Sequence, residues 1–218
     1  MRTTRVKVCC ISSLDEALMA IESGADAIGL VSAMPSGPGV ISEDLIRDIA
    51  ASVPPPIATF LLTCQQSVRE IVAQQQRCGT NTVQLCDRLL VGSYAELKAA
   101  MPGVAVVQVI HVNGPESVDE ATEIASQVDA LLLDSGNQAL PTRELGGTGR
   151  THDWQLSAEI RRTAQAPIFL AGGLRAENVR AAISQVEPWG VDLCSGVRSN
   201  GRLDHSKLEV FMRECRSC

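Results

Sequence analysis

The chain has 218 residues, of which 45% are hydrophobic and only 3% aromatic, and its formal net charge is −6. A chain of this length can bury a substantial core, and with so few aromatic residues the core has to consist of Val, Ile, Leu and Ala, as in parallel strands buried on both faces. The acidic balance argues against a basic, nucleic-acid-binding surface. Because no signal peptide and no run of about 18 apolar residues is found, we expect a cytoplasmic protein with reduced thiols and no membrane partner.

Short apolar runs alternate along the chain with segments of helical periodicity. The first run is followed by a helix that ends at Gly24, and Ser42 is placed to cap the second helix. In chain order, the expected strands lie at 6–11, 27–31, 57–62, 82–85, 104–112, 130–133, 167–171 and 191–194. The expected helices lie at 15–22, 42–49, 68–72, 94–100, 117–124, 154–160, 177–183 and 207–212.

Eight strand–helix units with no linker between them predict an α/β fold, a single-domain (β/α)8 TIM barrel over residues 1–218. A doubly wound open sheet is the alternative. It would require a glycine-rich phosphate turn after an early strand, and the segment 10–13 contains no glycine. In a barrel, the functional residues are expected where the strands end and the helices begin.

Glycine clusters follow the last three strands of the predicted barrel, and such loops let backbone N–H groups approach an anion closely. The loops after strands seven and eight of these barrels frequently hold a phosphate group. Tight turns without a ligand are the alternative interpretation. The candidate phosphate-binding residues are Gly147, Gly149, Gly172, Gly173, Ser195 and Gly196.

Two reactive side chains lie at predicted strand ends. Asp134 follows three leucines, and a carboxylate there is costly to desolvate unless it has a partner or a role, such as that of a general acid. Cys9 ends the first strand and shares one strand face with Lys7, whose ammonium would favour the thiolate. A structural Asp and a buried, inert Cys are the alternatives for these two positions.

Taken together, these motifs closely resemble the phosphoribosylanthranilate isomerase family of tryptophan biosynthesis, with this chain as a divergent member. The resemblance covers the whole chain, and its most specific stretch is Asp129-Ala-Leu-Leu-Leu-Asp-Ser135 followed by Gly146-Gly-Thr-Gly149 and Asp153-Trp154. Lys7-Val-Cys9, Leu170-Ala-Gly-Gly-Leu174 and Ser195-Gly-Val197 extend it to both ends of the chain.

The resemblance implies a ribulose-phosphate-binding barrel and an Amadori rearrangement of an aminoaldose phosphate to an aminoketose phosphate. Asp134 would be the acid that protonates the furanose ring oxygen, and Cys9 would be the base that removes the C2 proton. Lys7 and the six residues of the glycine loops would bind the phosphorylated sugar. No metal or organic cofactor is implied, and a monomer or a homodimer is expected.

The chain departs from the family pattern mainly at the end of the site that holds the aglycone. Cys10 replaces the family's usual glycine after the catalytic cysteine. Gly39 stands where the family has an arginine that would pair with the anthranilate carboxylate. We therefore consider Arg198 or Arg150 as a replacement cation.

Three other functions remain open from the sequence. The chain could be a paralogue that isomerises a different N-substituted phosphoribosylamine, or a barrel that binds a phosphosugar without catalysis. A metal site is the third, because soft ligands from several strands could converge. Its ligands would be Cys9, Cys86, Cys194 and His111, while the Cys215–Cys218 pair is a weak metal or redox signal or a frayed tail.

Overall fold

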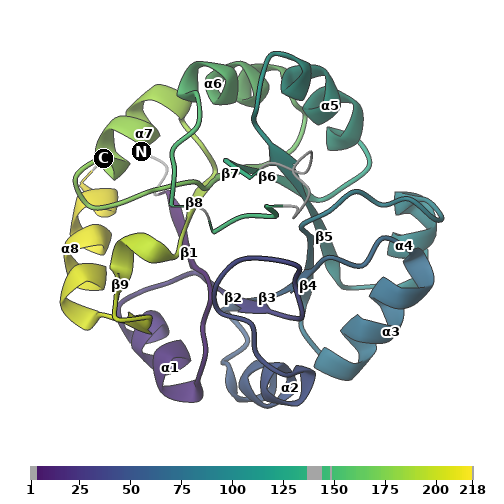
Figure 1. The fold of residues 1–218 in the computed structure, drawn as a ribbon, viewed down its shortest axis with the longest axis horizontal. Helices are drawn as coiled ribbons and strands as arrows, with labels where there is room; N and C mark the ends of the chain where they lie inside the picture. Colours follow the sequence, from purple (N-terminus) through teal and green to yellow (C-terminus); the bar gives the residue numbers. More distant parts are fainter. Residues whose placement is uncertain (1–3, 137–143, 148, 218) are drawn as a thin grey trace.

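Eight parallel strands close into a barrel in the order in which they occur along the chain, and the helices surround it (Figure 1). The computed structural model describes residues 4–136, 144–147 and 149–217. The strands are β1 Arg5–Val8, β2 Ala27–Val31, β3 Ala58–Thr63, β4 Thr82–Leu85, β5 Ala105–His111, β6 Ala130–Asp134, β7 Ile168–Leu170 and β8 Gly190–Leu193. The helices are α1 Leu14–Glu22, α2 Glu43–Ser52, α3 Val68–Cys78, α4 Tyr94–Ala100, α5 Glu116–Ala125, α6 Trp154–Thr163, α7 Val179–Val186 and α8 His205–Arg216.

The predicted barrel is thus confirmed, and each predicted strand and helix overlaps an observed one. The first strand is shorter than predicted. It ends at Val8 because the chain turns at Cys10, whose φ of 60° is incompatible with an extended strand. The short elements that follow β8 were not predicted: a 3-10 turn η1 at Ser195–Val197 and a hairpin of β9 Arg198–Ser199 and β10 Arg202–Leu203.

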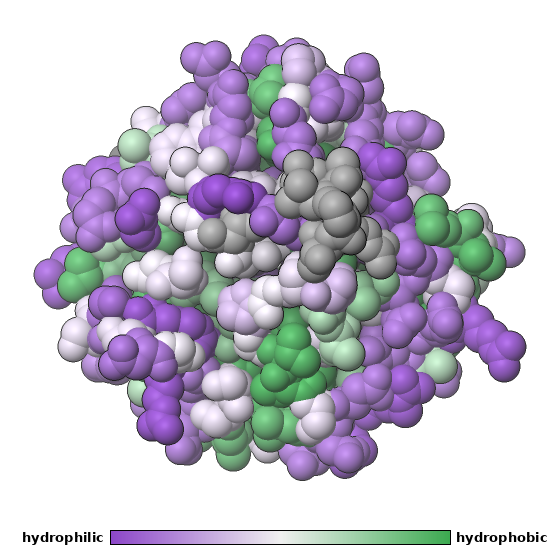
Figure 2. Space-filling view, in the orientation of Figure 1, coloured by the Kyte–Doolittle hydropathy of each residue, from purple (hydrophilic) through white to green (hydrophobic). Residues whose placement is uncertain are grey.

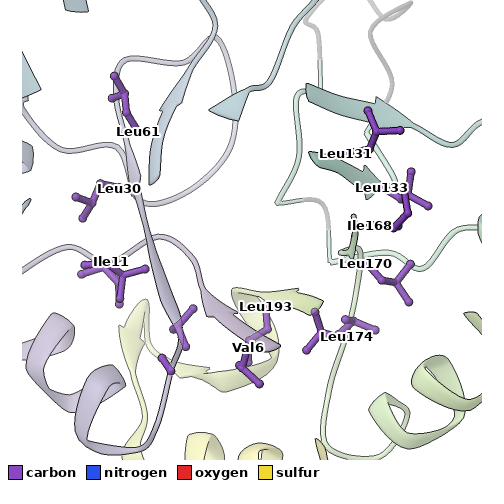
Figure 3. Packing of buried hydrophobic residues seen from close by; sticks show 14 of the residues in the cluster. Val6, Ile11, Leu30, Leu61, Leu131, Leu133, Ile168, Leu170, Leu174 and Leu193 are labelled. Atoms are coloured by element: carbon purple, nitrogen blue, oxygen red, sulfur yellow. The ribbon is translucent and has the colours of Figure 1, made fainter. Parts of the chain in front are cut away.

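Two separate cores result from the two-residue period of the strands. One set of side chains points outward and packs against the helices, and Figure 3 shows Leu30, Leu133 and Leu170 pointing away from the centre of the ring. The alternate set fills the barrel interior, with Phe60 and Phe169 in an edge-to-face contact whose ring centroids are 5.9 Å apart. Two of the few aromatic side chains of the chain therefore lie inside the barrel.

Serine side chains begin several helices and fix where the loops at the barrel mouth end. Ser13, Ser42, Ser67 and Ser93 each accept a hydrogen bond from a backbone N–H in the first turn of the following helix. Gly24 follows α1 with a φ of 94°, as predicted for the helix end. Within the described residues, no helix is both long and apolar enough to span a bilayer.

Candidate active site

A cleft opens at the mouth of the barrel, where the strands end and the loops to the helices begin. The loop after β2 and the described part of the loop after β6 lie across this mouth in Figure 1, and Figure 2 shows hydrophilic residues mainly around the rim of the same face. Strand ends and loops from around the barrel contribute to the cleft. Its lining includes Cys9, Cys10, Met34, Pro38, Gln84, Cys86, Asp134, Leu145, Gly146, Gly147, Gly149, Gly172, Gly173, Asp192, Cys194 and Ser195.

Asp134 is the last residue of β6 and has the same parity as the interior residues Ala130 and Leu132, so its carboxylate points into the mouth. Its side-chain Oδ1 accepts a 2.7 Å hydrogen bond from the backbone N–H of Ser135. Oδ2 lies against Gly146, where an added Cβ would stand 2.6 Å from it. The carboxylate is therefore held between its own strand and the β6–α6 loop, with one edge turned to the cleft.

Cys9, the residue that follows β1, faces the same cleft three strands away from Asp134 around the ring. It is 6% exposed, and its backbone N–H donates to the Leu193 carbonyl at 2.8 Å. A Cβ added to Gly29 would stand 2.9 Å from the Cys9 Sγ and 3.1 Å from the Lys7 Nζ. The thiol and the ammonium thus approach the same glycine, in agreement with the shared strand face expected from the sequence.

Lys7 is itself fully buried and does not line the cleft. Its Nζ pairs with the Asp192 Oδ1 at 3.0 Å and lies 5.1 Å from the centre of the Phe60 ring. Burial opposes the charged ammonium, but attraction to Asp192 and Cys9 outweighs it and raises the pKa of Lys7 above its usual value. This geometry does not fit direct substrate binding by Lys7. It gives the residue an electrostatic role beneath Cys9.

The glycine loops approach one another closely beside the cleft. A Cβ on Gly173 would lie 2.9 Å from the Gly149 carbonyl, and one on Gly196 would lie 2.2 Å from the Leu174 carbonyl. Gly147, Gly149, Gly172, Gly173 and Ser195 line the cleft, whereas Gly196 lines a separate groove that shares Ser195 with it. The structure therefore brings the predicted loops together, with Gly196 packed against the Leu174 carbonyl.

Three further thiols, those of Cys10, Cys86 and Cys194, line the same cleft as Cys9. Burial raises the pKa of Cys86 well above its usual range. The side-chain interaction between Cys10 and Cys194 raises the pKa of Cys10 and lowers that of Cys194. The raised pKa of Cys10 disfavours its thiolate, so Cys10 is poorly suited to share the role of a base with Cys9.

Arg198 and Arg150, considered above as replacement cations, have partners within the chain. Arg198 forms an ion pair with Glu16 at 3.1 Å, with both side chains about nine-tenths buried. Arg150 pairs with Glu144 in the exposed part of the β6–α6 loop. Neither is among the described residues that line the cleft, so the structure does not support either one as the cation for the aglycone.

The proposed metal ligands do not converge. Among the described residues, no three His, Cys, Asp or Glu side chains lie close enough to hold a metal ion. The Nε2 of His111 is within hydrogen-bond distance of the Cys86 carbonyl, 3.0 Å away. Cys215 is buried in the last helix, 2% exposed, so it is not part of a frayed tail, and Cys218 lies outside the described residues.

Several residues of the site were not predicted from the sequence. Asp192 sits in an apolar strand as Asp134 does, and the same rule of a carboxylate among apolar neighbours could have identified it. His152 adjoins Gly172, where an added Cβ would stand 3.1 Å from its Nδ1 and 3.4 Å from the Asp134 Oδ1. Burial lowers the pKa of His152 despite its carboxylate neighbours Asp134 and Asp153. No spacing in the sequence pointed to this histidine.

Comparisons with known proteins identify one family over nearly the whole chain. The model of the family described as N-(5'-phosphoribosyl)anthranilate (PRA) isomerase matches residues 6–214. The N-(5'-phosphoribosyl)anthranilate isomerases of Methanothrix thermoacetophila and Haloarcula marismortui are 37% and 36% identical to the chain. The alignments cover 99% of both chains for the first, and 98% of this chain and 96% of the relative for the second.

Solved structures extend the likeness to three dimensions. The phosphoribosylanthranilate isomerase of Thermotoga maritima has a TM-score of 0.81 at 30% identity, over 99% of this chain and 100% of that one. A phosphoribosylanthranilate isomerase in complex with reduced 1-(o-carboxyphenylamino)-1-deoxyribulose 5-phosphate has a TM-score of 0.78 at 28% identity, with the same coverage.

Proposed function

Because this chain belongs to the N-(5'-phosphoribosyl)anthranilate isomerase family, we propose that it converts N-(5'-phosphoribosyl)anthranilate into 1-(o-carboxyphenylamino)-1-deoxyribulose 5-phosphate. The observation that carries the proposal is the placement of Cys9 and Asp134, which enter one cleft from different sides of the barrel mouth. A substrate between them would present its ring oxygen to one group and its C2 proton to the other.

In this proposal, Asp134 donates a proton to the furanose ring oxygen, and the nitrogen lone pair expels that oxygen from C1 to form an iminium ion. The Cys9 thiolate then removes the C2 proton, and the electrons of that C–H bond neutralise the iminium to give an enolamine. Tautomerisation of the enolamine yields the ketose. The buried ammonium of Lys7 places a positive charge near the Cys9 sulfur.

The phosphate is assigned to the loops after β7 and β8 together with the Gly149 region. Gly172, Gly173 and Ser195 offer backbone N–H groups and a hydroxyl at one end of the cleft. The apolar side chains of Met34 and Leu145, from the loops after β2 and β6, offer a contact surface for the aromatic ring at the cleft.

The test of the chemistry is turnover of phosphoribosylanthranilate, followed by the change in anthranilate fluorescence. Asp134→Asn keeps the shape of the side chain but cannot donate a carboxylic proton, and Cys9→Ser removes the thiolate. We expect each variant to lower kcat by at least about 10²-fold. Cys194→Ser is the matched comparison, because Cys194 is also a thiol at the cleft. Full activity of Asp134→Asn, or an equal loss in Cys194→Ser and Cys9→Ser, would contradict the assigned roles.

The phosphate assignment has a separate test. Gly196→Ala places a methyl group against the Leu174 carbonyl and pushes the turn after β8 away from the loop after β7. We expect KM to rise several-fold more than kcat falls, because the phosphate contacts bind substrate and transition state alike. An unchanged KM in a correctly folded variant would contradict the assignment of the phosphate to these loops and favour another part of the cleft. Inhibition by inorganic phosphate, weakened in the variant, provides an independent readout.

A further inference from the structure

A buried ion pair behind the cleft joins segments from opposite ends of the chain. Glu16 is in the first turn of α1, and Arg198 begins β9, 182 residues further on. The Nη1 of Arg198 donates to the Glu16 Oε1 at 3.1 Å, and its Nη2 donates to Oε2 at 3.2 Å. This paired geometry fixes the plane of the guanidinium as well as its position.

The same guanidinium also binds the backbone beside the proposed base. Its Nη2 donates to the carbonyl of Cys9 at 3.3 Å and to the carbonyl of Cys10, while Nη1 donates to the Gly201 carbonyl at 3.0 Å. Glu16 completes the arrangement by accepting from the backbone N–H groups of Ser12 at 2.9 Å and Leu203 at 2.8 Å. We call Arg198 and Glu16 with these contacts the Arg198–Glu16 clamp.

The clamp satisfies acceptors that the sheet leaves open. The N–H of Cys9 is paired with β8, and the ladder to β2 resumes only at Ile11, whose N–H donates to the Gly29 carbonyl at 3.0 Å. Between them, the left-handed conformation of Cys10 turns the chain out of the strand. Buried carbonyls need donors, and the Nη2 of Arg198 supplies them here for both Cys9 and Cys10.

We propose that Arg198 is a positioning residue that fixes the Cys9 thiol in the cleft by holding the carbonyls on its C-terminal side, an inference that rests on the proposed function of Cys9 as the base. β8 holds the N–H of Cys9, and the clamp holds the peptide that follows it. Without the clamp, the first sheet hydrogen bond after Cys9 is that of the Ile11 N–H, two residues further along the chain. A displacement of about 1 Å at a reacting group can cost about 10²-fold in rate.

The test compares Arg198→Met with Arg198→Lys and with Arg88→Met. Arg88 also forms an ion pair after a barrel strand, with Glu120 at 3.0 Å, but its side chain is exposed and its partner lies on α5. We expect Arg198→Met to lower kcat by about 10- to 100-fold with little change in KM. Arg198→Lys keeps the charge but not the fork, so it should recover only part of that loss. Arg88→Met should retain the parental kcat.

A second readout does not depend on turnover. The rate of Cys9 alkylation by iodoacetamide is measured in the folded protein by mass spectrometry, with fragmentation to separate Cys9 from Cys10. Cys78, the fully buried last residue of α3, is the internal reference for global loosening. We expect Cys9 labelling to accelerate several-fold in Arg198→Met while Cys78 labelling stays unchanged.

These measurements separate the inference from the proposed function. If the parental protein does not turn over phosphoribosylanthranilate, the proposed function fails, and the alkylation rates still report whether Arg198 positions Cys9. If Cys9 labelling is unchanged in Arg198→Met, or if Cys9 and Cys78 accelerate together, the positioning role is overturned. A kcat loss in Arg88→Met equal to that in Arg198→Met would overturn it as well.

Discussion

At the residue scale, the structure connects two departures from the family pattern that are 29 residues apart. Cys10 occupies the space beside Gly39, where an added Cβ would stand 2.5 Å from the Cys10 Cβ and 3.0 Å from its Cα. Gly39 also has a φ of 80°, which strains any residue with a Cβ. A side chain at position 39, including the arginine of the family pattern, is therefore incompatible with Cys10 in its present conformation.

This packing predicts that substitutions at the two positions are coupled. Gly39→Ala should lower the free energy of unfolding by about 1–3 kcal/mol, from backbone strain and from the contact with Cys10. In a Cys10→Gly background the contact with the Cβ is gone and only the approach to the Cα remains, so Gly39→Ala should cost less. Urea unfolding of the four proteins measures the coupling.

Gly103→Ala is the matched control for that coupling. Gly103 has a similar φ of 85° but no atom within 4 Å of the added Cβ, so it isolates backbone strain from contact. Equal costs for Gly39→Ala in both backgrounds would show that the steric account of the Cys10–Gly39 pair is incorrect.

At the scale of elements, periodicity was sufficient to predict the barrel, because each strand and helix contributes its own local pattern. The strands 27–31 and 82–85 and the helix 94–100 were predicted with their observed bounds. What periodicity could not supply is the pairing of distant segments. Nothing local to Arg198 indicates that it reaches Glu16, and the left-handed turn at Cys10 has no glycine to signal it.

The residues of the candidate site show the same contrast between local patterns, which were predictable, and distant contacts, which were not. The ends of strands were predictable, so Cys9, Asp134 and the glycine loops were found from sequence and meet at one mouth. The sequence pattern placed Lys7 on the correct strand face and suggested that it binds substrate. A lysine inside a closed barrel, however, needs a buried counter-charge, and Asp192 of β8 provides it. Contacts across the barrel form only when the sheet closes, and local sequence patterns do not show which side chains then meet.

The clamp that joins α1 to the β9–β10 hairpin predicts a contribution to stability that depends on pH. Burial opposes the ionised form of Glu16, but hydrogen bonds from Leu203, Arg198 and Ser12 outweigh it and lower the pKa of Glu16 below its usual 4.5. A carboxyl with a lowered folded-state pKa stabilises the fold above its unfolded-state pKa, and that stabilisation is lost as the pH falls further.

We therefore expect Glu16→Gln to be less stable than the parental protein near neutral pH, with the difference shrinking as the pH falls below about 4.5. Urea midpoints at pH 7, 5 and 4 for both proteins provide the measurement. Glu120→Gln, which alters the exposed pair with Arg88, is the control and should show a much smaller difference at every pH. A difference for Glu16→Gln that stays constant down to pH 4 would contradict this linkage.

At the scale of the whole molecule, the barrel interior contains an ion pair on neighbouring strands. The Lys7 and Asp192 residues are register partners of β1 and β8, the first and last strands, so their attraction acts where the barrel closes. Both side chains are more than nine-tenths buried. A buried pair of this kind contributes little net stability relative to apolar residues, but removing one partner leaves an uncompensated charge in the interior.

Lys7→Met should therefore lower the free energy of unfolding by about 3–5 kcal/mol, because it leaves the Asp192 carboxylate without a counter-charge inside a closed barrel. The double variant Lys7→Met/Asp192→Asn removes both charges and should recover most of that loss. Arg5→Met is the control, since Arg5 pairs with Asp26 at the exposed end of the same strand and should change stability by less than about 1 kcal/mol. Urea unfolding measures all three variants. If the double variant is no more stable than Lys7→Met, the loss of stability comes from packing in the barrel interior, and the unpaired charge of Asp192 cannot be its cause.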